Sequence, residues 1–142
     1  MTKFFYAFFA FVLMVSPMSA HADGHGGKQV VHAKPALYAV SMHAEWCGSC
    51  KIVQPKLAAA RGKAGLDDSN ILFVTLDLTD QTTRHQSQLL AETLGIGPLY
   101  QKNNGKTGYV ALIDPKTNQE VARLTKDMSA GQMIDLLKQK AG

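Results

Sequence analysis

The sequence predicts a single α/β domain in which a mixed sheet of about four strands is flanked by helices. Its 142 residues correspond to about one domain. Short apolar runs alternate with segments of helical character in the first part of the domain, which is typical of parallel strands joined by crossover helices. Near the C-terminus, two short strand-like runs flank a turn-rich hexapeptide, which is typical of an antiparallel hairpin.

The first strands and the first helix are predicted from apolar patterning. The apolar run at 36–42 follows turn-forming residues and predicts a buried strand. The segment 51–61 predicts a helix, and Pro55 should kink it because proline removes an amide donor and crowds the preceding turn. The run at 71–78, ILFVTLDL, is β-branched and largely apolar, which predicts a central parallel strand.

A second helix is expected to end near Leu94, just before Gly95. Either Thr79 or Asp80 can cap its N-terminus, because each has a side-chain oxygen that can accept from the first-turn amides. The residues expected on neighbouring turns of its packed side are Gln86, Leu89, Leu90 and Thr93. The segment 97–108, GPLYQKNNGKTG, is rich in turn residues and is predicted to be a loop.

The C-terminal part is predicted to be a hairpin followed by a helix. Strands at 109–113 and 120–124 flank the hexapeptide DPKTNQ, whose composition favours a turn. Ser129 can cap the last helix. The apolar stripe of that helix consists of Met133, Ile134, Leu136 and Leu137.

The N-terminal segment 1–22 has the layout of a secretory signal peptide. Lys3 supplies a positive start, 4–15 is an apolar run of 12 residues, and Ala20 and Ala22 place small residues where a signal peptidase reads them. The apolar run is shorter than the roughly 20 residues of a membrane span. We therefore expect cleavage, a periplasmic or secreted protein, and no stable membrane span afterwards; an uncleaved anchor is the alternative.

Residues 23–35 are Gly- and His-rich, which predicts a flexible lead-in to a folded domain at 36–142. Removing the signal peptide removes one lysine and no acid, so the net charge falls from +4 to +3. This charge is spread along the chain without an arginine-rich stripe, which argues against a nucleic-acid partner. A total of two cysteines excludes a disulfide-dense scaffold and a four-thiolate metal site.

The pair Cys47 and Cys50 carries the predicted chemistry. Its C-x-x-C spacing falls where the first strand gives way to the first helix, so Cys47 is expected near a helix N-terminus. Unpaired amides and the helix dipole stabilise a thiolate there, and the thiolate is the species that attacks a disulfide. Cys50 lies in the first turn of the helix and can reach Cys47 to close a ring.

Other uses of the pair follow from the same spacing. Half of a zinc site would need further ligands, and there is no second cysteine pair. Haem attachment would place a histidine after the second cysteine, where Lys51 stands. An inert disulfide is also conceivable, although so short a loop confines little chain entropy. Redox chemistry is favoured, and metal binding, an inert bridge and a non-catalytic binding module stay open.

The stretch 44–51, AEWCGSCK, resembles the active site of the thioredoxin family, with Ser49 where the commonest form has proline. Pro55 matches the proline that kinks the family's active-site helix, and the order of elements matches from residue 36 onward. The resemblance implies a thioredoxin-like fold without the full N-terminal strand and helix. It also implies Cys47 as nucleophile and Cys50 as resolving thiol. The residues that would shape the site or contact substrate are Trp46, Gly48 and Ser49.

The sequence departs from the family pattern beside the cysteines. Ser41 stands where thioredoxins usually have a buried aspartate, and Thr75 stands where its lysine partner is expected. Deprotonation of Cys50 therefore needs another route, for which water and Glu45 are the candidates. His43 stands where an aromatic residue is common, and its cationic form would favour a thiolate nearby.

A second departure concerns the cis-proline that the family has opposite its cysteines. Aligning the third strand places Gly108, preceded by Thr107, at this position. Pro98 is the other candidate, although it would leave a long insertion before that strand. A peptide bond after glycine is expected to be trans. The segment 97–106 could then serve as a specificity element, with Tyr100 as a contact.

The resemblance implies a thiol–disulfide oxidoreductase that acts on protein substrates without a cofactor and exchanges electrons with a partner protein. The direction of electron flow stays open, because it depends on the relative stability of the two redox forms. The alternative function is a metal-binding carrier in which Cys47, Cys50 and His43 hold copper or zinc. His25 and His32 could add ligands to such a site.

Overall fold

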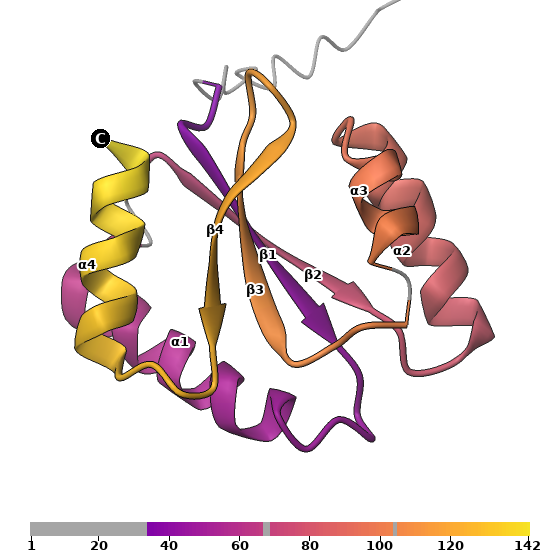
Figure 1. Cartoon of the computed structure of the whole chain (residues 1–142), viewed down its shortest axis with the longest axis horizontal. Helices are drawn as coiled ribbons and strands as arrows, with labels where there is room; N and C mark the ends of the chain where they lie inside the picture. Colours follow the sequence, from indigo (N-terminus) through magenta and orange to yellow (C-terminus); the bar gives the residue numbers. More distant parts are fainter. Residues whose placement is uncertain (1–33, 67–68, 104) are drawn as a thin grey trace, which may run out of the picture. The chain divides into compact units, whose positions relative to one another are not determined.

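The computed structural model describes residues 34–66, 69–103 and 105–142 (Figure 1). The predicted signal peptide and most of the predicted lead-in lie outside these residues. The described elements follow the order strand, helix, strand, two helices, two strands, helix. The prediction of a mixed four-stranded sheet flanked by helices is therefore confirmed.

The sheet has the order β2-β1-β3-β4. Strand β1 (Leu37–His43) runs parallel to β2 (Ile71–Asp77) and antiparallel to β3 (Tyr109–Asp114), and β3 pairs with β4 (Gln119–Thr125) as a hairpin. The central position predicted for 71–78 is wrong, because β2 pairs only with β1 in the described sheet. Only Ile71 and Leu76 of β2 are buried, and its other side chains are partly or fully accessible, as in a strand at an edge.

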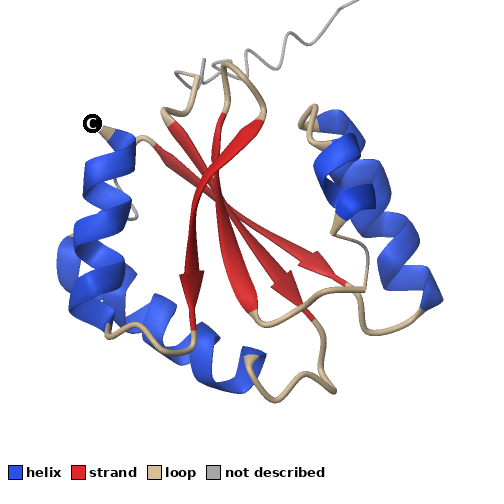
Figure 2. Ribbon diagram, viewed as in Figure 1, coloured by secondary structure: helices blue, strands red, loops and turns tan. Residues whose placement is uncertain are grey.

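The helices cover both faces of the sheet (Figure 2). Helices α1 (Cys50–Ala64) and α4 (Ala130–Ala141) pack together on one face, and α2 (Gln81–Thr93) and α3 (Gly97–Lys102) pack together on the other. Asp80 and Ser129 cap α2 and α4, each in a capping box. The helices thus sandwich the sheet between two apolar layers.

The core consists of two layers because successive strand residues point to opposite faces. Leu37 and Ala39 face α1 and α4, whereas Tyr38, Val40 and Met42 face α2 and α3. Strand β3 alternates in the same way between the two layers. Both faces of the central strands are therefore buried, which holds the ends of β1 and β3 in fixed positions.

Two helical predictions need correction. The segment predicted as a loop at 97–108 begins with α3, where Pro98 stands at the start of the helix, a position that proline tolerates. In α2, Leu89 and Leu90 are exposed, and the small residues Ser87 and Ala91 face the sheet instead. The Ser87 hydroxyl donates to the Asp77 carbonyl, so α2 packs closely against β2.

In the described parts of the chain, no helix is both long enough and apolar enough to cross a membrane.

Candidate active site

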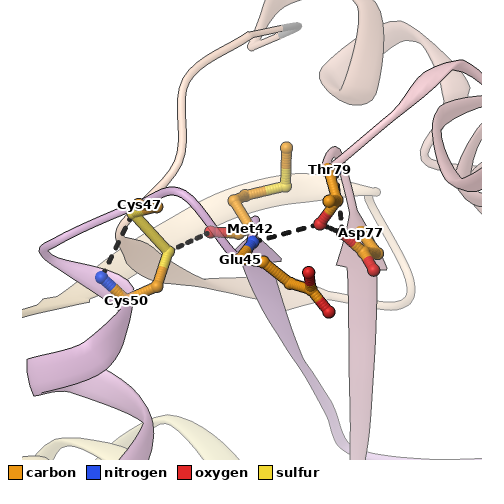
Figure 3. Close-up of a disulfide and its surroundings, with 6 residues drawn as sticks. All are labelled: Met42, Glu45, Cys47, Cys50, Asp77 and Thr79. Carbon is orange, nitrogen blue, oxygen red and sulfur yellow. Dashed lines mark hydrogen bonds between the residues drawn. A yellow bond between two sulfur atoms is a disulfide. The ribbon is translucent and has the colours of Figure 1, made fainter.

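The two cysteines lie where β1 passes into α1, and they form a disulfide (Figure 3). Cys47 lies in the loop that follows β1, and Cys50 is the first residue of α1. Their Cα atoms are 5.3 Å apart. Cys47 is 6% exposed and Cys50 only 1%. A partner can therefore approach Cys47, whereas Cys50 is shielded by the protein.

The polar surroundings of the two sulfur atoms differ in sign. The backbone N–H of Cys50 donates to Cys47 Sγ at 3.1 Å, which favours negative charge on that sulfur. The carbonyl oxygen of Met42 lies 3.7 Å from Cys50 Sγ (Figure 3). A carbonyl oxygen disfavours negative charge nearby and can accept a proton donated by a thiol. The site thus distinguishes a thiolate position at Cys47 from a thiol position at Cys50.

The N-terminus of α1 reinforces this difference. Ser49 occupies the N-cap position but makes no side-chain cap, and the first turn contains no acidic residue. The amides of Cys50 and Lys51 both point to the carbonyl oxygen of Cys47, at 3.1 and 3.4 Å. The positive end of the helix dipole therefore lies at Cys47 without a competing carboxylate in the helix.

Gly108 lies directly against the cysteine loop, residues 44–49, which connects β1 to α1. Its φ is +90°, and its N–H donates to the Met42 carbonyl at 2.9 Å. A Cβ atom at this position would stand 2.5 Å from the Ser49 Cβ and 3.3 Å from Cys47 Sγ. Only glycine fits so close an approach with this backbone conformation. Pro98 belongs to α3, and the described chain contains no cis peptide bond.

The structure places the remaining predicted site residues at differing depths. Trp46 is 56% exposed, and a side chain at Gly48 would point into open space. Thr107 is half-buried beside Gly108. Glu45 is exposed, and Figure 3 shows its carboxylate pointing away from the sulfur atoms. This orientation does not support Glu45 as the proton acceptor for Cys50.

The proposed metal site is not assembled in the described residues. No three His, Cys, Asp or Glu side chains there are grouped closely enough to hold a metal ion, which includes the set Cys47, Cys50 and His43. The Nδ1 atom of His43 is buried without a hydrogen-bond partner. His25 and His32 lie outside the described residues.

The comparisons with known proteins agree with this geometry. A sequence model of the Thioredoxin family matches residues 26–92. Among solved structures, a thiol:disulfide interchange protein of the thioredoxin family from Chlorobium tepidum TLS shares 19% identity over 77% of this chain and 82% of that chain, with a TM-score of 0.51. The chain has a thioredoxin-like fold, and the family-model match supports a place in the thioredoxin-like superfamily. A thioredoxin-like domain with a cysteine pair at disulfide distance supports thiol–disulfide oxidoreductase activity in general.

Trxlp from Edwardsiella tarda EIB202 shares 21% identity over 75% of this chain and 85% of that chain, with a TM-score of 0.48. A search of curated proteins found no match.

Two hydroxyl residues, Ser41 and Thr75, occupy the positions where the thioredoxin pattern has an aspartate and its lysine partner. Ser41 is buried and stands opposite Thr75 in the register of β1 and β2. Thr75 is exposed. A buried carboxylate is therefore replaced by a small neutral side chain on the strand that leads into the cysteine loop.

Tyr100 does not contact the site, so its predicted role in specificity is wrong. It belongs to the core between α3 and the sheet, and its hydroxyl donates to the Arg84 carbonyl at 3.0 Å. Tyr109 is also buried, with the Arg123 guanidinium 3.8 Å from its ring centre. The Tyr109 hydroxyl has no hydrogen-bond partner in the described residues.

These two tyrosines form a matched pair for a stability measurement. Tyr100→Phe removes a hydroxyl that is bonded, so we expect a loss of about 1 kcal/mol in the free energy of unfolding. Tyr109→Phe removes an unpaired buried hydroxyl, so we expect no loss or a gain. Urea unfolding at neutral pH would measure both. Equal losses in the two variants would contradict the difference in hydrogen bonding.

Tyr109 also predicts that the stability of the folded state depends on pH in the alkaline range. Burial raises the pKa of Tyr109, with partial compensation from Arg123, and the neutral form is therefore favoured in the folded state. Unfolded chains lose this proton first as pH rises, so stability should fall as pH passes the normal tyrosine range. The fall should be smaller in Tyr109→Phe.

Sequence reasoning missed two residues of the site, Thr79 and Asp77. Thr79 was expected only as one of two candidate caps for α2, and Asp80 is the cap. The hydroxyl of Thr79 instead accepts the N–H of Glu45 at 3.0 Å. A polar pair of the form Asp-x-Thr directly after a strand, next to a separate cap residue, is the signal that could have identified it.

Proposed function

We propose that this protein catalyses thiol–disulfide exchange with protein substrates, with Cys47 as nucleophile and Cys50 as resolving thiol. The observation that carries the proposal is the unequal treatment of the two sulfur atoms. Cys47 Sγ accepts an amide N–H at a helix N-terminus and belongs to the more exposed residue of the pair, whereas Cys50 Sγ faces a carbonyl oxygen. This arrangement supports attack by Cys47 as thiolate and storage of the second proton on Cys50.

In the reductive direction, the reduced protein transfers two electrons. The Cys47 thiolate attacks one sulfur of the substrate disulfide, a mixed disulfide forms, and the other substrate sulfur leaves as a thiolate. Cys50 then gives up its proton and attacks Cys47 Sγ, which forms the Cys47–Cys50 disulfide and releases the second substrate thiolate. The oxidative direction reverses each step. The chemistry needs no cofactor, and a redox partner protein restores the starting state.

The surface around Cys47 suits a protein substrate. Trp46 is an exposed aromatic next to the nucleophile, and the position of a Cβ at Gly48 has no atom within 4 Å. These features support a partner that presents its cysteine on an exposed strand or loop.

The location of the protein is part of the same proposal. The charged start, apolar run and small residues of segment 1–22 favour export to the periplasm or the cell exterior. Disulfides persist in those compartments, so protein substrates would be available there.

The proposal is tested by incubating the reduced protein with a small secreted protein that has an accessible disulfide. We expect two new thiols on that protein for each Cys47–Cys50 disulfide formed, counted by alkylation and mass spectrometry. The same count after mixing oxidised protein with a reduced substrate tests the opposite direction. Absence of transfer in both directions, from a protein whose own pair can be oxidised and reduced, would overturn the proposal.

A further inference from the structure

Thr79 joins the loop after β2 to the cysteine loop through two hydrogen bonds. Its hydroxyl oxygen accepts the backbone N–H of Glu45 at 3.0 Å, and its carbonyl oxygen accepts the indole N–H of Trp46 at 3.1 Å. Glu45 and Trp46 precede Thr79 by 34 and 33 positions in the sequence, respectively. Both residues bonded to Thr79 directly precede Cys47 in the chain.

Asp77 fixes the direction of the Thr79 hydroxyl. Its Oδ1 atom accepts the hydroxyl proton of Thr79 and also the backbone N–H of Thr79, the latter at 2.9 Å (Figure 3). A hydroxyl has one proton, so donation to Asp77 leaves a lone pair for the N–H of Glu45. The three residues therefore form a directed chain of hydrogen bonds from the end of β2 to the cysteine loop.

Residues 44–49 make few hydrogen bonds to other segments of the fold, although the Leu78 N–H bonds the His43 carbonyl just before them. Ser49 makes no side-chain cap at the N-terminus of α1. Within the loop, the Cys47 N–H donates to the Ala44 carbonyl, which is a local turn. In the described chain, the hydrogen bonds that connect residues 44–49 to a different segment of the fold end on Thr79. Asp80 caps α2, so the Thr79 hydroxyl is not needed there.

We propose that Thr79, oriented by Asp77, is a positioning residue that holds Trp46 in place as the contact surface for the protein substrate. This inference rests on the proposed function. Because the indole N–H is bonded within the protein, the exposed part of Trp46 is its apolar ring. The ring thus presents a fixed apolar wall beside Cys47, suited to an apolar side chain near the substrate cysteine.

The proposal separates substrate binding from chemistry. The polar contacts of the sulfur atoms are with the Cys50 N–H and the Met42 carbonyl, not with Thr79. Loss of the Thr79 hydroxyl keeps the bond between the Trp46 indole and the Thr79 carbonyl but removes the bond to the Glu45 N–H, which fixes the backbone next to Trp46. We therefore expect the KM for a protein disulfide to rise about fivefold, the factor that corresponds to one net hydrogen bond. The kcat should change less than about twofold, since the reacting atoms stay in place.

The experiment compares Thr79→Val, which removes the hydroxyl at constant shape, with Thr79→Ser, which retains it. Thr93→Val is the matched control, because the Thr93 hydroxyl bonds to a carbonyl of its own helix, α2. Trp46 is the single tryptophan of the chain, so tryptophan fluorescence reports on its environment alone. We expect Thr79→Val to change the emission maximum and anisotropy, and Thr79→Ser and Thr93→Val to match the wild type.

The outcomes distinguish the two proposals. Unchanged fluorescence and KM in a folded Thr79→Val variant would overturn the positioning role while leaving exchange activity intact. A change in kcat as large as the change in KM would also overturn it, because the hydroxyl would then act on the reacting atoms. If the wild type lacks exchange activity, the proposed function fails, whereas the fluorescence comparison still tests whether Thr79 holds Trp46.

Discussion

Replacing Cys47 with serine is expected to reduce the rate of thiol–disulfide exchange by a factor on the order of 10⁴ or more, as removal of a catalytic nucleophile typically does. A serine hydroxyl at this position is not ionised near neutral pH and cannot form the mixed disulfide. Cys50→Ser should behave differently, because Cys47 retains the N–H donated by residue 50 and its place at the helix N-terminus. The first attack then proceeds, and the resolving step is lost.

The contrast between the two variants is the informative measurement. Each reduced variant is mixed with a disulfide-containing protein, quenched with acid and separated without reductant. Cys50→Ser should accumulate a covalent adduct that disappears when a reductant is added, and Cys47→Ser should not. The double variant Cys47→Ser, Cys50→Ser controls for other chemistry, since the chain has no further cysteine. A stable adduct in Cys47→Ser but not in Cys50→Ser would mean that Cys50 is the nucleophile, which would contradict the proposal.

Local patterns predicted the cysteine site because the necessary information lies within one short segment. A strand that ends at His43 and a helix that begins at Cys50 leave Cys47 in the connecting loop, whatever the rest of the fold does. The position of Gly108 was harder to predict, because it depends on aligning a strand that is distant in sequence with the third strand of the family. The structure does place Gly108 beside Cys47.

What the sequence did not predict depends on how distant segments pack. An apolar β-branched run fits a central strand, but β2 lies at the edge of the described sheet because its neighbours are set by the crossover from β1. Tyr100 was expected beside the site because it lies in a turn-rich segment, yet α3 forms there and buries it. Thr79 was ambiguous, because the same hydroxyl can cap a helix or bond to another loop, and only the presence of Asp80 decides between these uses.

Gly108→Ala is expected to produce the largest effect outside the cysteines. The added Cβ would stand 2.5 Å from the Ser49 Cβ, a separation that requires the cysteine loop to move. Overpacking of this kind costs about 1–3 kcal/mol. Strain from the positive φ adds about 1–2 kcal/mol, since φ at residue 108 is +90°. Because the added Cβ would also stand 3.3 Å from Cys47 Sγ, the nucleophile should be displaced and exchange should slow as well.

Two matched variants separate these contributions. Gly105→Ala is the control for backbone strain, because Gly105 has a φ of +83° and no atom within 4 Å of the position of a Cβ. Ser49→Gly removes the clashing Cβ. Gly108→Ala should lose more stability and exchange rate than Gly105→Ala, and the double variant Ser49→Gly, Gly108→Ala should recover most of that additional loss. Urea unfolding and exchange kinetics on the four variants complete the cycle. Equal losses in Gly108→Ala and Gly105→Ala would mean that the close approach to Ser49 and Cys47 is not required, and that the glycine serves only the backbone conformation.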